Sequence, residues 1–91
     1  MPRVEIARRF IKAFRRLSPP IQKAAEKALV TLIERPESKG LNLEPLTGMK
    51  GFYSIRVNLN YRILLQRRED DDGEFFSAED VDTHDIYARK G

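Results

Sequence analysis

The feature that most constrains the fold is a regular alternation of apolar and polar side chains on both sides of a short segment, Asn58-Leu59-Asn60. The apolar side chains occupy every second position: Tyr53, Ile55 and Val57 before the segment, and Tyr61, Ile63 and Leu65 after it. Alternation with a period of two around an Asn-bearing turn predicts a β-hairpin. A three-residue loop places Arg56 opposite Arg62 and every apolar pair on one face, which a one-residue slip would destroy.

Two amphipathic segments precede the hairpin and predict helices. The first covers residues 6–17, with apolar side chains at helical spacing. Five basic residues fill the rest of its surface and form either a solvent face or a docking face for RNA or an acidic partner: Arg8, Arg9, Lys12, Arg15 and Arg16. The second covers residues 19–34, with Ser18 as N-cap, Pro19 at the first helical position and Pro36 beyond its end. We expect an antiparallel helical hairpin.

The remaining segments complete a small sheet. Residues 3–6 give a weak strand signal, residues 35–51 form a predicted loop, and a last strand runs from Phe75 toward Val81 after a turn signal at residues 70–73. Helices followed by a run of strands predict an α+β fold. We expect an N-terminal strand and a helical hairpin packed on one face of a small, mainly antiparallel twisted sheet. The length suits one domain, residues 1–91.

The absence of cysteine narrows the chemistry. Disulfides, thiolate zinc sites and thiol nucleophiles are excluded, and a reducing, cytoplasmic location is expected. The N-terminus has no apolar signal core, and no segment approaches the length of a membrane span. Phosphate-binding and dinucleotide-binding loop motifs are absent. We therefore expect neither a cofactor nor a bound metal.

Charge is distributed unevenly along the chain. Residues 1–68 carry 15 Lys/Arg and 5 Asp/Glu, a net charge of +10, whereas residues 69–91 carry 2 and 9, a net charge of −7. A basic body of this kind suits a nucleic-acid backbone, and a solvated charged surface is an equal alternative. The acidic run at residues 69–74 lacks the spacing of a calcium loop and is interpreted as a solvated turn.

Arg56 and Arg62 are the first candidate site residues. The hairpin register places them directly opposite each other on the face away from the core, where like charges destabilise a sheet. Two adjacent guanidinium groups match the oxygens of a phosphate, and Lys50, just before the hairpin, adds to the positive field. In the alternative interpretation, the arginines point into solvent or pair with the acidic segment at residues 69–85.

His84 and Tyr87 are the candidates near the C-terminus. His84 is the only histidine, and imidazole is the side chain best suited to transfer protons near neutral pH. A lone histidine is more often an ordinary surface or partly buried residue. Tyr87 offers a hydroxyl or a stacking ring, although core packing is the simpler interpretation. The residues alone therefore leave both roles open.

Four motifs together make the chain similar to the RelE/ParE toxin superfamily of toxin–antitoxin systems. They are Leu46-Thr47-Gly48, Phe52-Tyr53-Ser54-Ile55-Arg56-Val57, Tyr61-Arg62-Ile63-Leu64 and His84-Asp85-Ile86-Tyr87. The resemblance covers nearly the whole chain and includes the helical hairpin. It implies a RelE-like fold and a cytoplasmic toxin whose partners are a cognate antitoxin, the ribosome and mRNA.

For RelE-type members, the resemblance implies metal-independent cleavage of mRNA in the ribosomal A site, by attack of a ribose 2′-hydroxyl on the neighbouring phosphate. Carried over by position, Arg56 and Arg62 support the scissile phosphate. His84 is a candidate general acid or base, and Tyr87 stacks on the substrate or acts near it. The resemblance therefore implies an endoribonuclease with four catalytic candidates.

One position departs from the RelE pattern. RelE has a lysine, a main catalytic candidate, where this chain has Ser54. We expect Ser54 and Lys50 to lie at the substrate-binding surface, with proton transfer passing to His84 if the chain is a nuclease. Two other functions stay open. One is inhibition of DNA gyrase in the manner of ParE, and the other is a non-toxic role in binding an antitoxin.

Overall fold

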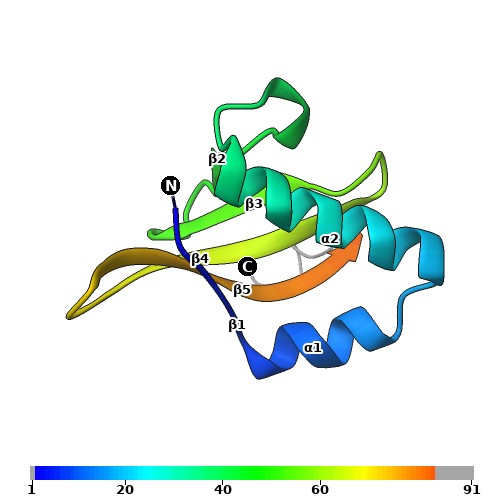
Figure 1. The fold of residues 1–91 in the computed structure, drawn as a ribbon, viewed down its shortest axis with the longest axis horizontal. Helices are drawn as coiled ribbons and strands as arrows, with labels where there is room; N and C mark the ends of the chain where they lie inside the picture. Colours follow the sequence, from blue (N-terminus) through cyan, green and yellow to red (C-terminus); the bar gives the residue numbers. More distant parts are fainter. Residues whose placement is uncertain (1, 84–91) are drawn as a thin grey trace.

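One mixed sheet carries both helices on its core side (Figure 1). The computed structural model describes residues 2–83. The elements in chain order are β1 (Val4–Ile6), α1 (Arg8–Arg15), α2 (Pro19–Glu34), the 3-10 helix η1 (Lys39–Leu41), β2 (Glu44–Pro45), β3 (Phe52–Arg56), β4 (Tyr61–Asp70) and β5 (Gly73–Thr83). The strand order is β1-β5-β4-β3-β2, with β1 parallel to β5 and the other pairs antiparallel. The predicted α+β class is confirmed.

The hairpin of β3 and β4 has the predicted register. Val57 donates its N–H to the carbonyl of Tyr61 at 3.0 Å, and Arg56 faces Arg62. The side chain of Asn58 closes the turn, because its Oδ1 accepts the N–H groups of both Asn60 and Tyr61 at 2.8 Å. An Asn side chain that satisfies its own turn in this way fixes the loop length, and the loop length fixes the register.

The core lies between this sheet and the two helices. Its buried members come from both layers: Phe10, Ala25, Ala28, Leu32, Leu41, Ile55, Ile63, Leu65, Ala78 and Val81. Figure 1 shows α2 in front of β3 and β4, and α1 beside β5. Two fully or nearly buried alanines, Ala25 and Ala28, allow α2 to approach the sheet closely. Each larger apolar side chain that is buried here contributes roughly 1.5–3 kcal/mol.

A β-bulge in β5 sets which side chains face away from the core. Leu65 pairs with Ala78 and Leu64 pairs with Asp80, so Glu79 is an extra residue in β5. Ala78 and Val81 therefore both reach the core, although they are three positions apart. The bulge explains why the last strand shows no clean alternation at residues 79–80. The strand also begins before the predicted Phe75 and continues beyond Val81.

The first helix is shorter than predicted at both ends, since it ends at Arg15 and not at residue 17. α1 begins at Arg8 and not at residue 6, because residues 4–6 pair with β5 as a parallel strand. α2 has the predicted bounds. Ser18 is its N-cap, and its carbonyl accepts the N–H of Gln22 at 2.9 Å, but its side chain makes no capping bond. Neither helix within residues 2–83 is long and apolar enough to cross a membrane.

The predicted loop at residues 35–51 contains two short elements that the sequence pattern missed. η1 buries Leu41 against the core, and Asn42 follows it with a φ of 53°. β2 places Glu44 opposite Ser54 and Pro45 opposite Tyr53. A proline is tolerated here because β2 lies at the edge of the sheet. This edge strand brings an acidic side chain close to the face that carries the arginines.

Candidate phosphate-binding site

Arg62 lies on the sheet face opposite the core. The next residue, Ile63, is part of the core, and successive side chains of a strand point to opposite faces. The register places Arg56 of β3 on one side of Arg62 and Asp82 of β5 on the other. The predicted facing of the two arginines is therefore confirmed, and a carboxylate joins the same row.

A second row of side chains lies next to the arginine row. Leu64 is flanked by Ser54 of β3 and Asp80 of β5. Ser54 and Leu64 are fully buried. Ser54 in turn faces Glu44 of β2, whose half-exposed carboxylate places Oε1 3.9 Å from Nη1 of Arg62. Glu44 therefore reaches across β3 to the Arg62 guanidinium.

The Arg62 guanidinium is buried and keeps unused donors. The residue is 7% exposed, and within residues 2–83 neither Nε nor Nη1 has a hydrogen-bond partner. Its ion pair with Glu44, at 3.9 Å, is longer than a charge-assisted hydrogen bond of about 2.7–2.9 Å. A buried charge without full hydrogen bonding costs several kcal/mol. Both nitrogens are inaccessible to solvent in this structure, so an oxyanion that accepts their N–H groups and removes that cost requires the covering side chains to move.

Asp80 and Asp82 hold the backbone beside the site. Asp80 Oδ1 accepts the N–H of Val81 at 2.8 Å, and Asp82 Oδ1 accepts the N–H of Thr83 at 2.7 Å. β1 pairs only with an earlier part of β5. The two carboxylates therefore satisfy backbone donors along the edge that β1 leaves uncovered, which protects this edge from pairing with another strand.

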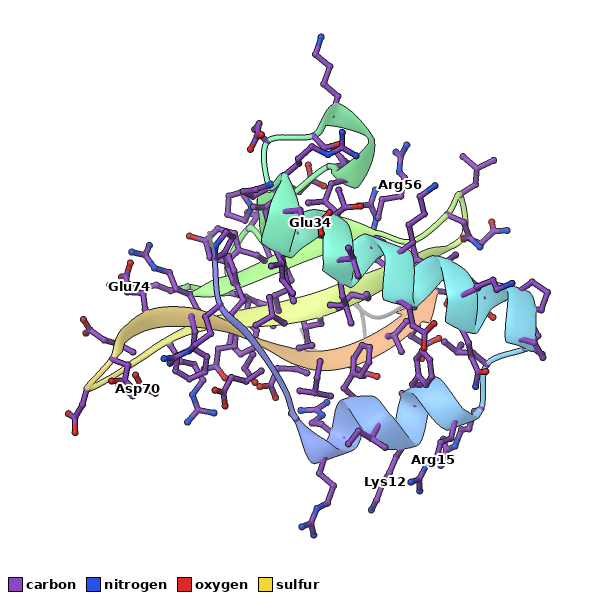
Figure 2. The ribbon with its side chains drawn as sticks, viewed as in Figure 1. Lys12, Arg15, Glu34, Arg56, Asp70 and Glu74 are labelled. Carbon is purple, nitrogen blue, oxygen red and sulfur yellow. The ribbon has the colours of Figure 1, made fainter. Side chains whose placement is uncertain are left out.

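Arg56 occupies a different environment from Arg62. It is the last residue of β3 and is exposed. Together with Lys27 and Arg35, it borders a groove of about 420 Å³ between the end of β3, α2 and η1. Figure 2 shows Arg56 close to α2, above the sheet in this view. One arginine of the row is thus embedded in the sheet face, and the other lies at its rim.

The other predicted site residues are placed as follows. Lys50 is exposed and precedes β3, so the length of this strand, roughly 13 Å, separates it from Arg56. The structure does not bring Lys50 to the arginine row. Ser54 does lie in the neighbouring row. His84 and Tyr87 lie outside the described residues, and their roles stay predictions.

The carboxylates at the acidic turn between β4 and β5 form ion pairs with arginines other than Arg56 and Arg62. Arg3 donates a hydrogen bond to Asp70 at 2.7 Å, which lowers the pKa of Asp70 below its ordinary value. Arg67 pairs with Glu74. Figure 2 shows Asp70 at the far tip of the hairpin, at the opposite end of the sheet from Arg56. Among residues 2–83, no group of acidic or histidine side chains is arranged to hold a metal ion.

Sequence reasoning missed Glu44 and the two aspartates of β5 as neighbours of Arg62. Glu44 belongs to a strand of two residues, which has no detectable periodicity. The aspartates reach this face only because the bulge at Glu79 shifts their register. The one available signal was the blurred alternation at residues 79–80, which is typical of a bulge.

A scan of protein-family models finds no match to the sequence, and a search of curated proteins finds none either. Solved structures do match the fold. The free form of the E. coli toxin RelE has 22% sequence identity and a TM-score of 0.67, over 96% of this chain and 90% of that chain. The toxin chain of the intact E. coli RelBE toxin–antitoxin complex has 23% identity and a TM-score of 0.62, over 91% of this chain and 96% of that one.

A third similar structure is the YoeB/ParE toxin from Agrobacterium tumefaciens, with 14% identity and a TM-score of 0.70, over 90% of this chain and 98% of that chain. These chains are matched along nearly their whole length. The predicted resemblance to the RelE/ParE superfamily is therefore confirmed at the level of the fold.

Proposed function

We propose that this chain is the toxin of a toxin–antitoxin pair and that it cleaves mRNA on the ribosome without a metal ion. The observation that carries the proposal is the buried Arg62 guanidinium, whose Nε and Nη1 have no hydrogen-bond partner within residues 2–83. A phosphate group offers the oxygens that such a guanidinium binds best. The likeness in fold to RelE supports the same reaction class.

The cleavage step is an attack of a ribose 2′-oxygen on the adjacent phosphorus. The bond from the 2′-oxygen to phosphorus forms while the bond from phosphorus to the 5′-oxygen breaks, leaving a 2′,3′-cyclic phosphate and a 5′-hydroxyl. A base takes the 2′ proton, an acid protonates the leaving 5′-oxygen, and cations stabilise the charge that grows on the phosphate. All bonded atoms come from the RNA, so the step needs no co-reactant.

In the proposed step these roles are assigned to five residues. Arg62 binds a non-bridging oxygen of the scissile phosphate, and Arg56, in the same row, adds a second positive charge. Glu44 takes the 2′ proton, since its Oε1 lies 3.9 Å from Nη1 of Arg62 and a phosphate bound there is within its reach. His84 gives a proton to the leaving oxygen, and Tyr87 stacks on a base of the substrate.

Ser54 stands where RelE has a lysine, so another residue has to perform the role of that lysine. Ser54 is fully buried and cannot supply the charge of a lysine. Its small side chain lies next to Glu44 across the β2–β3 pairing, on the face that carries Arg62. In this chain the Glu44–Arg62 pair takes over the two tasks that such a lysine could perform. The carboxylate acts as the base, and the buried guanidinium acts as the phosphate-binding cation.

The proposal includes a partner that blocks the site. The RelBE structure with which this chain shares its fold is a toxin–antitoxin complex. We expect a cognate antitoxin to bind this chain in the cytoplasm with an acidic or amphipathic segment, and to cover Arg62. Release from the antitoxin would then expose the site to mRNA on the ribosome.

Induced expression of the chain alone, with primer extension on cellular mRNA, tests the proposal. Codon-phased cuts in translated messages that disappear in Arg62→Ala would support it. Growth arrest with intact mRNA would overturn it and favour a gyrase-directed activity of the ParE type. Normal growth would leave a non-toxic protein that binds an antitoxin.

A further inference from the structure

A groove between α2, η1 and the end of β3 gathers three cations: Lys27, Arg35 and Arg56. All three are exposed. Within residues 2–83 no carboxylate lies within ion-pair distance of any of them, and no carboxylate lines the groove. The acidic residues nearest in sequence, Glu26, Glu34 and Glu37, lie outside its lining. The groove is therefore a concentrated positive site whose charges are not neutralised by these residues.

The end of α2 explains only part of this charge. A helix C-terminus favours nearby cations, which accounts for Arg35, the residue directly after α2. Lys27 lies seven positions before Glu34, about two helical turns from that end, where the effect has faded. Arg56 comes from another element altogether. The convergence of the three side chains therefore has no explanation in helix stability.

The groove and the candidate phosphate-binding site share one residue, although they lie on different sides of the sheet. Arg56 belongs to both, because it borders the groove and also faces Arg62 in the β3–β4 register. Directly opposed residues of antiparallel strands are about 5 Å apart. Because α2 covers the core side of the sheet and Arg62 lies on the other side, a single strand held by Arg62 has to bend around the end of β3 at Arg56 to reach Lys27 and Arg35.

We propose that this groove binds the phosphate backbone of single-stranded RNA next to the scissile phosphate. The inference rests on the proposed function, since that function supplies the RNA. Polar groups of Thr31 and Ser38 also line the groove, over a floor that includes Ala28 and Leu41. Short polar side chains and free cations suit phosphate and ribose contacts, which position a nucleic acid without reading its sequence.

The test is binding of a single-stranded hexanucleotide with 2′-O-methyl riboses, which the proposed reaction cannot cleave, measured by fluorescence anisotropy at several salt concentrations. The slope of log affinity against log salt is negative, and each lost phosphate contact makes it shallower by about 0.7. Lys27→Gln/Arg35→Gln should therefore make the slope shallower by about 1.4 and lower the affinity at low salt roughly tenfold. The melting temperature of this double variant and of its control checks that both proteins are folded.

The matched control is Arg67→Gln/Arg68→Gln, which removes the same charge from exposed residues of β4 close to Asp70, at the opposite end of the sheet from Arg56 (Figure 2). It should change the slope by less than half as much. Equal losses in both variants, an unchanged groove variant, or no salt-dependent binding by the wild-type protein would each overturn the proposal. So would a groove variant that loses binding of a poly-glutamate peptide but keeps binding of the RNA, since the groove would then serve a protein partner.

This assay separates the two proposals because it requires no cleavage. Loss of binding in the groove variant, with no cleavage by the wild-type protein on ribosomes, would support the groove and overturn the endonuclease. Cleavage that depends on Arg62, together with unchanged RNA binding by the groove variant, would support the endonuclease and overturn the groove proposal.

Discussion

Glu44 Oε1 and Arg62 Nη1 lie 3.9 Å apart, although β3 separates the two strands that carry them. They meet on the face where Ser54, the β3 residue opposite Glu44, is fully buried. Glu44 is half exposed while Arg62 is buried, so one partner faces water and the other is held by the sheet. In the proposed mechanism, the pair therefore combines an accessible proton acceptor with a donor that the sheet holds in place.

Replacing Glu44 with Gln tests the carboxylate as general base. Gln keeps the size of the side chain and cannot take a proton from a 2′-hydroxyl. Single-turnover cleavage of mRNA on purified ribosomes should slow by roughly 10²–10⁴-fold. Glu37→Gln, an exposed residue of the preceding loop, is the control and should cleave like the wild-type protein. Equal rates in both variants would remove Glu44 from the mechanism.

Arg62→Met tests whether the guanidinium is kept for function and not for stability. Replacing a buried ion pair by apolar groups of similar volume is often neutral or stabilising, by about 1–4 kcal/mol, and the partner left behind here, Glu44, is half exposed and can be solvated by water. The free energy of unfolding, from urea titration, should therefore stay the same or rise while cleavage is lost. Ile63 is the next residue along β4, and its side chain lies in the core. Ile63→Ala should therefore lower the free energy of unfolding by about 2–5 kcal/mol, which shows that the titration is sensitive.

A loss of more than about 1 kcal/mol in Arg62→Met would mean that Arg62 is a structural partner. The unpartnered Nε and Nη1 would then need another explanation, and the phosphate-binding role would lose its main support.

His84→Gln tests the proton donor that the sequence predicts. Gln can still donate a hydrogen bond but cannot transfer a proton, so the cleavage rate should fall roughly 10²–10⁴-fold. The same ribosome assay measures it. A decrease smaller than about threefold would make His84 a structural residue and leave the leaving-group acid unassigned.

Asp70→Asn tests the ion pair at the acidic turn. The hydrogen bond from Arg3 lowers the pKa of Asp70, so its stabilising contribution is present above the ordinary carboxyl pKa of 3.8 and disappears as the pH falls through the lowered value. The melting temperature of the wild-type protein should therefore exceed that of the variant near neutral pH, and the two should converge in strong acid.

The difference in melting temperature should be small and should shrink with added salt, because the pair is exposed. A difference that is constant from neutral pH to strong acid would show that Asp70 acts through the turn geometry, where its Oδ1 accepts the N–H of Asp72, and not through Arg3.

The register of the hairpin of β3 and β4 could be predicted because its alternation is strict and its turn is short. A register shift of one residue would expose Ile55 and Ile63, so the pattern has a single solution. The two-residue strand β2 could not be predicted, because it exists only through pairing with β3. Glu44 was therefore missing from the predicted site, although the pairing of Arg56 with Arg62 was predicted correctly.

The bulge at Glu79 limited the prediction in another way. It changes which face each later residue of β5 occupies, and a single sequence does not reveal where a strand adds a residue. Asp82 consequently stands beside Arg62 as an unexpected neighbour. Burial also could not be read from the hairpin, since Arg62 and Arg56 occupy equivalent positions in the pattern and yet differ in exposure.

The most direct test of the central claim compares Arg62→Gln with Arg68→Gln. Both remove one positive charge from β4, but Arg68 is exposed near the acidic turn and faces Phe75. The rate of mRNA cleavage on ribosomes, measured in a single turnover, should fall at least about 10²-fold in Arg62→Gln and less than about threefold in Arg68→Gln. Cleavage by Arg62→Gln at the wild-type rate would contradict the account, because the buried guanidinium would then not be the group that holds the phosphate.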